Sequence, residues 1–236
     1  MRLLLLVLSC VVGQSSNLLA HDFEWKNLLM ASLKLRQGLD YDANVDSYME
    51  VFRPDVWNRY RNDEFEMVGK RKETIAMMKQ AVASFDLEEY FDIRTSTRFR
   101  NYDFDSKCFP IDALTEKSYF YASSYPNGGF PSTIEVFMRN PKVVNKFDMG
   151  ESQAKEFLRT RKDRNGEINR NVYMKLSVRI VKAKPGPNEL IAEIMNYRIY
   201  ADENYTKLLH EFDLAKDTAA TTVTPQLNDT SKKASS

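Results

Sequence analysis

The stretch VYMKLSVRI, from Val172 to Ile180, decides the fold of this chain. Apolar side chains occupy every second position from Val172 onward, which is the period of a strand with one buried face. A turn rich in proline and glycine follows at 184–188, and a second strand is expected at 189–200. Together the two segments predict a long antiparallel hairpin at the centre of a sheet.

Further strands are expected on the N-terminal side of this hairpin, at 91–99, 119–122 and 133–138. The first of them alternates clearly, because Phe91, Ile93 and Phe99 share one face while Asp92, Arg94, Ser96 and Arg98 fill the other. A short helix at 151–160 interrupts the strands.

The first part of the chain reads as helical. Residues 21–37 predict a short amphipathic helix or an extended docking arm, and helices are expected at 44–52 and from Pro54 onward. The clearest helix runs over 63–85, with Asp63 as its cap. Its apolar positions follow the helical period: Phe65, Val68, Ile75, Met78, Val82 and Phe85.

This order predicts an α+β fold with N-terminal helices packed on a C-terminal antiparallel β-sheet. We expect a single domain over 21–212, with a helical part at 21–85 and a β-rich part at 86–212. The tail at 213–236 has almost no large apolar residues and is expected to be disordered.

Residues 1–20 have the three-part pattern of a secretory signal peptide: one positive charge, an apolar run over 3–13 and a small residue before the cut. The run is too short to span a membrane, which takes about 20 apolar residues. Cleavage is expected after Ala20 or Gly13, which predicts a secreted or periplasmic protein. Cys10 leaves lipid anchoring open as a less favoured alternative.

Removal of the leader takes away Arg2 and Cys10, and the formal net charge falls from +1 to zero. Such a balance argues against a nucleic-acid partner. Cys108 is then alone, so no internal disulfide can form, and its apolar neighbours indicate a buried thiol. The segment from Arg139 to Lys184 is locally basic, which suits either anionic partners or ordinary solvated faces.

The sequence carries no catalytic signature. The only histidines are His21, at the expected mature terminus, and His210, in a segment just before the tail that we expect to be helical. Asp63, Glu64 and Glu66 resemble an acid/base cluster, but carboxylates gather in the first turn of a helix for electrostatic reasons alone. We therefore expect a protein that is not an enzyme.

One stretch mimics a calcium loop. Its oxygen-bearing side chains have the spacing of the first positions of an EF-hand: Asp40, Asp42, Asn44 and Asp46. Val45 and Val51 stand where that loop requires glycine and a bidentate glutamate, so we expect no metal site and no cofactor.

The segment SYFYASSYPNGGFPS, at 118–132, is the best candidate for a ligand-binding surface. Its aromatic residues beside a glycine loop could stack on a sugar or take an extended peptide, although hairpin packing explains them as well. The candidate residues are Tyr119, Tyr121, Tyr125 and Phe130.

Three strings occur in the order of a bacterial exported family: YMEVFRPDVWNRYRNDEFE at 48–66, RNYDFDSKCFPI at 100–111 and MGESQAKEFLRTRK at 149–162. In these strings the chain resembles the domain-of-unknown-function 4852 family, over most of residues 40–202. The resemblance implies a location in the bacterial envelope and brings no activity or site residue.

The sequence thus favours a non-enzymatic binding or interaction domain whose partner is an envelope protein or glycan. Two alternatives stay open. One is a carboxylate-dependent hydrolase acting on envelope polysaccharide, and the other is a structural module of an envelope assembly.

Overall fold

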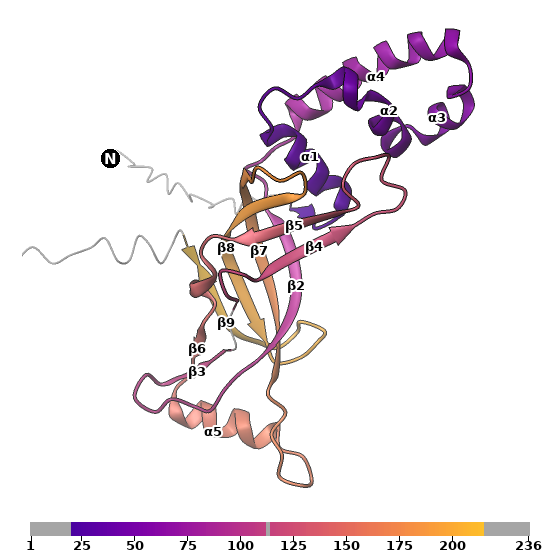
Figure 1. Ribbon diagram of the computed structural model, residues 1–236. Helices are drawn as coiled ribbons and strands as arrows, with labels where there is room; N and C mark the ends of the chain where they lie inside the picture. Colours follow the sequence, from indigo (N-terminus) through magenta and orange to yellow (C-terminus); the bar gives the residue numbers. More distant parts are fainter. Residues whose placement is uncertain (1–19, 112–113, 215–236) are drawn as a thin grey trace, which may run out of the picture.

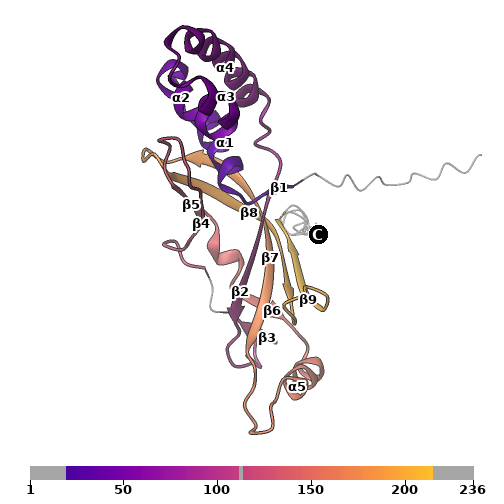
Figure 2. The same cartoon turned by 90° about the vertical axis from the view of Figure 1, so that its right-hand side faces the viewer.

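The computed structural model describes residues 20–111 and 114–214. Helices and a large sheet form an elongated molecule, with α1–α4 at one end and α5 at the other (Figures 1 and 2). The α+β class is confirmed, and the N-terminal helices precede the strands as expected. The leader, Cys10 and the tail beyond Leu214 lie outside the described residues.

The helices lie close to their expected places. They are α1 (Trp25–Leu35), α2 (Tyr41–Phe52), α3 (Pro54–Tyr60), α4 (Glu64–Ser84) and α5 (Glu151–Thr160), with a short 3-10 turn η1 (Pro141–Val143). Pro54 begins α3, where its missing N–H needs no partner. The Asp63 side chain accepts a hydrogen bond from the Glu66 backbone N–H at 3.0 Å, so the expected cap of α4 is confirmed.

Nine strands accompany these helices in the described part of the chain. They are β1 (His21–Asp22), β2 (Phe91–Arg98), β3 (Cys108–Pro110), β4 (Tyr119–Ser123), β5 (Thr133–Met138), β6 (Lys146–Asp148), β7 (Asn171–Ala183), β8 (Glu189–Tyr200) and β9 (Leu208–Asp213). The main sheet has the order β1-β2-β7-β8-β5-β4, and β3 and β6 form a small sheet of their own.

The predicted hairpin is the centre of the main sheet. β7 and β8 pair in antiparallel fashion through most of their length, and the alternate positions from Val172 to Ile180 are buried. β5 pairs with the first part of β8, and β9 pairs with its last part.

The sheet is mixed and not purely antiparallel, which corrects the sequence prediction. β1 pairs with β2 in parallel, and so does β5 with β8. A period of two shows which face of a strand is buried but says nothing about the direction of its neighbour, so the pattern alone could not reveal this.

The segment before the tail is a strand and not the expected helix. Residues Leu208–Asp213 lie along β8 as β9, and the Phe212 ring stacks on Tyr197 at 5.1 Å between centroids. His210 therefore belongs to a sheet edge, where pairing with β8 outweighs the local preference of the segment.

The buried face of α4 differs in part from the expected one. Phe65 is 92% exposed and Val68 is 53% exposed, whereas the neighbouring Met67 is buried with Val45 and Met49 of α2. Met78 and Val82 are buried as predicted and join the main core. The face of α4 is thus set by where α1 and α2 lie.

One continuous hydrophobic core runs along the molecule. It includes Trp25 and Leu28 of α1, the inner faces of β7 and β8, and Phe99, Phe109 and Phe147 near α5. No helix within the described ranges is long and apolar enough to cross a bilayer.

Candidate binding groove

The two outer strands of the main sheet face each other across a cavity. β2 lies near one end of the strand order and β4 at the other, so the sheet curves strongly to bring their edges together. The cavity has a volume of about 680 Å³, which is the size of a typical ligand pocket. Its lining residues are Asp22, Phe23, Glu24, Asp92, Ile93, Arg94, Tyr119, Phe120 and Tyr121.

A second cavity of about 460 Å³ continues along β4. It shares Phe23, Glu24 and Tyr121 with the first and reaches Lys26 and Ser124. The two cavities together are named the β2–β4 groove.

The wall formed by β2 presents unused backbone groups. The His21 N–H donates to the Tyr90 carbonyl at 2.7 Å, so even-numbered residues of this strand direct their backbone groups away from β7. β1 ends at the register of Asp92. Beyond it, no described strand pairs with Arg94 or Ser96 on this side.

The wall formed by β4 is open in the same way. The Ser124 N–H donates to the Ser132 carbonyl at 2.9 Å, which places Ser123, Tyr121 and Tyr119 at the positions not hydrogen-bonded to β5. Their backbone groups therefore point to the open side of β4. Each wall of the groove thus carries peptide donors and acceptors that the sheet does not use.

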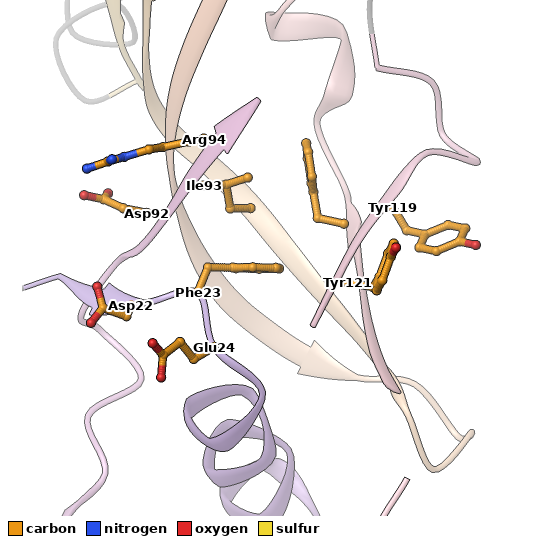
Figure 3. Close-up of a pocket in the computed structure, with 9 residues that line it drawn as sticks. Asp22, Phe23, Glu24, Asp92, Ile93, Arg94, Tyr119 and Tyr121 are labelled. Atoms are coloured by element: carbon orange, nitrogen blue, oxygen red, sulfur yellow. The ribbon is translucent and has the colours of Figure 1, made fainter. Parts of the chain in front are cut away.

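The floor of the groove is apolar. Figure 3 shows Phe23 and Ile93 pointing into the space between the two edges, while Asp92 and Arg94 point away from it. Phe120 lies opposite buried Val136 in the register and so belongs to the inner face as well. These three side chains form the floor of the groove.

Charge is unevenly distributed around the groove. Asp22, Glu24 and Asp92 stand on the β1–β2 side, against the single guanidinium of Arg94. The Asp92 carboxylate accepts a hydrogen bond from the Ser177 hydroxyl at 2.8 Å, which fixes its position. The groove is therefore acidic on one wall and aromatic on the other.

The structure brings together two of the four aromatic residues expected to bind a ligand. Tyr119 and Tyr121 line the groove with 48% and 63% of their surface exposed, and their ring centroids are 6.5 Å apart. Tyr125, 94% exposed, lies on the β4–β5 loop outside the lining set. Phe130 is buried in the main core and lies outside the residues that line the groove.

Sequence reasoning missed the opposite wall. The sequence predicts a short amphipathic helix or an extended docking arm over 21–37 and a strand over 91–99, and neither prediction marks Asp22 to Glu24 or Asp92 to Arg94 as part of a site. The alternation of HDFE at 21–24 was the one available signal for β1. Nothing local places this segment beside residues nearly a hundred positions later.

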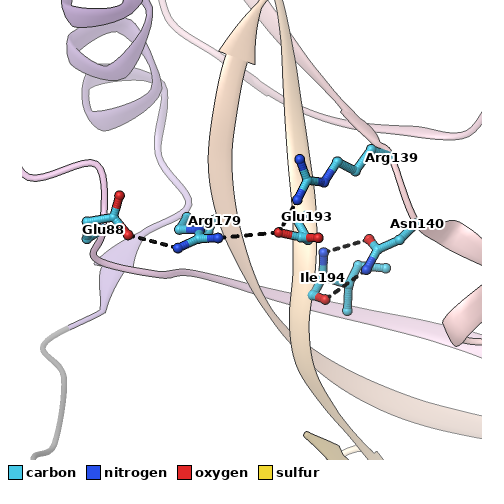
Figure 4. Close-up of polar contacts among 6 residues, drawn as sticks. All are labelled: Glu88, Arg139, Asn140, Arg179, Glu193 and Ile194. Carbon is cyan, nitrogen blue, oxygen red and sulfur yellow. Dashed lines mark hydrogen bonds and ion pairs between the residues drawn. The ribbon is translucent and has the colours of Figure 1, made fainter. Parts of the chain in front are cut away.

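Several basic residues of the segment from Arg139 to Lys184 are paired with acidic side chains within the molecule. Arg179 pairs with Glu88 and Glu193, and Arg139 also reaches Glu193 at 2.5 Å (Figure 4). Asn140 holds the β8 backbone beside this network, because its side chain both accepts from and donates to Ile194.

Other basic residues of the segment have acidic partners too: Lys146 with Asp148, Arg159 with Glu156, and Lys184 with Glu189. The segment is spread over several strands and α5.

The residues that mimic a calcium loop belong to helix α2. Asp40 caps it by accepting from the Ala43 N–H at 2.9 Å, and Asp46 accepts two hydrogen bonds from Arg71 at 2.7 and 2.8 Å. Among residues 20–111 and 114–214, no group of three or more His, Cys, Asp or Glu side chains is placed to hold a metal ion.

The two histidines lie on different strands. His21, on β1, stacks on Phe85 at 4.7 Å and contacts Glu89 at 3.0 Å, while His210 lies on β9. Asp63, Glu64 and Glu66 sit at the start of α4, with Asp63 as its cap, and line none of the groove.

Comparison with known families gives one match. A family model described as a domain of unknown function (DUF4852) matches residues 40–160, just over half of the chain. It spans β2 and β4 but ends before the central hairpin. No curated protein and no solved structure matches the chain.

Proposed function

Because the chain belongs to the DUF4852 family, whose description assigns no activity, we propose a function from the groove. The protein is an exported, non-enzymatic binding module of the bacterial envelope, and the β2–β4 groove is where its ligand lies. The observation that carries this proposal is a cavity of about 680 Å³ with an acidic wall, an aromatic wall and unused backbone groups on both.

Export rests on the leader at 1–20, with its short apolar run and a small residue before the expected cut. His21, the first residue after a cut at Ala20, already has a place in the fold as part of β1. Cleavage there would leave every residue that lines the groove in the mature chain.

Binding is favoured over hydrolysis by the placement of the carboxylates. General acid/base chemistry on a glycoside needs two carboxyl groups facing each other across the substrate. In the groove, Asp22, Glu24 and Asp92 all belong to the β1–β2 side, and the facing wall offers tyrosines. The hydrolase alternative predicts turnover of envelope polysaccharide that Glu24→Gln abolishes.

The test compares how much ligand is retained by three forms of the protein from which the leader has been removed. Wild type, Tyr119→Ala/Tyr121→Ala and Tyr125→Ala are immobilised and exposed to peptide and glycan fractions of the native envelope. Truncation of two aromatic contact residues is expected to weaken retention at least about tenfold. Tyr125→Ala is the matched control, since Tyr125 is an exposed tyrosine outside the groove.

A component held equally by all three forms would contradict the proposal and favour the structural-module alternative, in which the groove has no part. If wild type hydrolyses the glycan fraction, the result favours the hydrolase alternative over a binding module. Thermal unfolding of each form checks that the loss is not a loss of fold.

A further inference from the structure

Resting on the proposed function, we infer that the ligand is an extended polypeptide segment that adds to the open edge of β2 as a strand. Its inward side chains are apolar. Two features of the groove lead to this ligand: the hydrogen-bonding pattern of its walls and its apolar floor.

The edge of β2 already accepts a strand from within the chain. His21 and Asp22 pair with Phe91 and Asp92 in parallel, and the chain then turns into α1 with the Glu24 N–H bonded to the Asp22 carbonyl at 2.8 Å. No described strand therefore continues β1 alongside Arg94 and Ser96 of β2. A peptide strand on this line continues the ladder that β1 begins.

Both walls suit a peptide because their free groups recur at the spacing of a strand. β4 runs opposite to β2, as the chain of pairings through β7, β8 and β5 requires. A strand between them is parallel to one and antiparallel to the other, so neither direction is excluded. A glycan could stack on Tyr119 and Tyr121 but has no repeating donors for this ladder.

The floor selects the side chains on one face of the bound strand. Phe23, Ile93 and Phe120 would contact its inward side chains, which favours apolar residues. Its outward side chains lie at the register of Arg94 and Ser96, with Asp92 diagonal to them. Both signs of charge are therefore close to the outer face, and that face selects for neither.

The probe for this inference is a fluorescent eight-residue peptide of alternating serine and valine, and its binding to the protein without its leader is followed by fluorescence anisotropy. One matched probe carries N-methyl groups on alternate backbone amides, which removes the donors of one edge and keeps every side chain. A second replaces valine by serine, which removes the apolar inward side chains. We expect both to bind at least about tenfold more weakly.

Two protein variants change the β2 edge itself. Ser96→Pro removes an N–H that faces away from β7, a change that edge strands tolerate, and should abolish binding while the melting temperature stays close to wild type. Ser96→Ala keeps this N–H and is the matched control, which should bind the peptide like wild type.

The outcomes separate this inference from the proposed function. If a chito-oligosaccharide binds to wild type but not to Tyr119→Ala/Tyr121→Ala, and no peptide probe binds, strand addition is overturned. The groove is then a glycan-binding site. If the protein forms a dimer that Ser96→Pro converts to monomers, the occupant of the β2 edge is a second copy of the chain. That result also overturns the inference. If no probe binds, and the groove variants retain envelope components as well as wild type does, both the inference and the proposed function are wrong.

Discussion

At the scale of single residues, Cys108 shows how packing changes the chemistry of a side chain. It lies on β3 with 2% of its surface exposed. Burial raises the pKa of its thiol, the nearby Asp103 and Asp148 raise it further, and Lys146 opposes them. The folded protein therefore keeps the thiol proton at pH values where the unfolded chain, with a thiol pKa of about 8.5, has lost it.

Stability should consequently fall with rising alkalinity through this one group. The folded state binds more protons than the unfolded state above about pH 8.5, so the contribution is complete below that pH and is lost as pH rises towards the folded pKa. Urea unfolding of wild type and Cys108→Ala at pH 7 and pH 9.5 measures it. We expect Cys108→Ala to cost about 1 kcal/mol at pH 7, and less at pH 9.5. An equal cost at both values would contradict the raised thiol pKa.

At the scale of elements, the β4–β5 loop sets the position of the tyrosine wall. Gly128 has φ +58°, and a Cβ atom there would lie 2.4 Å from the Ser47 carbonyl oxygen of α2. Only glycine permits both this backbone conformation and this approach. The loop thus holds β4 against the helices, and with it Tyr119 and Tyr121.

Gly128→Ala is expected to destabilise the fold by about 2 kcal/mol or more, since positive φ and a backbone clash act together. Gly186→Ala, on the turn of the central hairpin with nothing nearer than 3.9 Å, serves as the matched control and should change stability by less than about 0.5 kcal/mol. Urea unfolding followed by circular dichroism measures both. Similar values for the two variants would show that the loop does not press on α2.

At the scale of the whole molecule, the continuous core predicts one cooperative unfolding transition despite the elongated shape. Trp25, 3% exposed and hydrogen-bonded to the Pro131 carbonyl at 2.9 Å, reports on the helical end. Cys108 reports on the β3–β6 region, towards the other end (Figure 1). The same hydrophobic cluster contains Trp25 and Phe109, the neighbour of Cys108.

Fluorescence of Trp25 in a Trp57→Phe background and thiol labelling of Cys108 should therefore give coincident urea midpoints. Coincidence is the expected result because neither end can lose its packing without exposing the shared core. Two separated midpoints would show that the helical end and the β3–β6 region unfold as independent units.

The sequence determined those features that depend on the repeat within one segment. Alternation from Val172 to Ile180, with the turn after it, predicted the central hairpin, and Asp63 and Pro54 predicted where two helices begin. Such signals are local, because a strand or helix with one buried face needs its apolar side chains at a fixed spacing. The alternation of the strand at 119–122 also predicted that some of its rings face solvent, and Tyr119 and Tyr121 are exposed.

Only the tertiary structure decided which surfaces meet. It made the sheet mixed, turned Phe65 to solvent while Met67 was buried, and took Phe130 into the core. It also set Asp22 and Asp92 opposite the tyrosines, across an opening between two sheet edges. The physical reason is that the spacing of apolar residues fixes which face of an element avoids water, whereas the partner of that face depends on how all elements exclude water together.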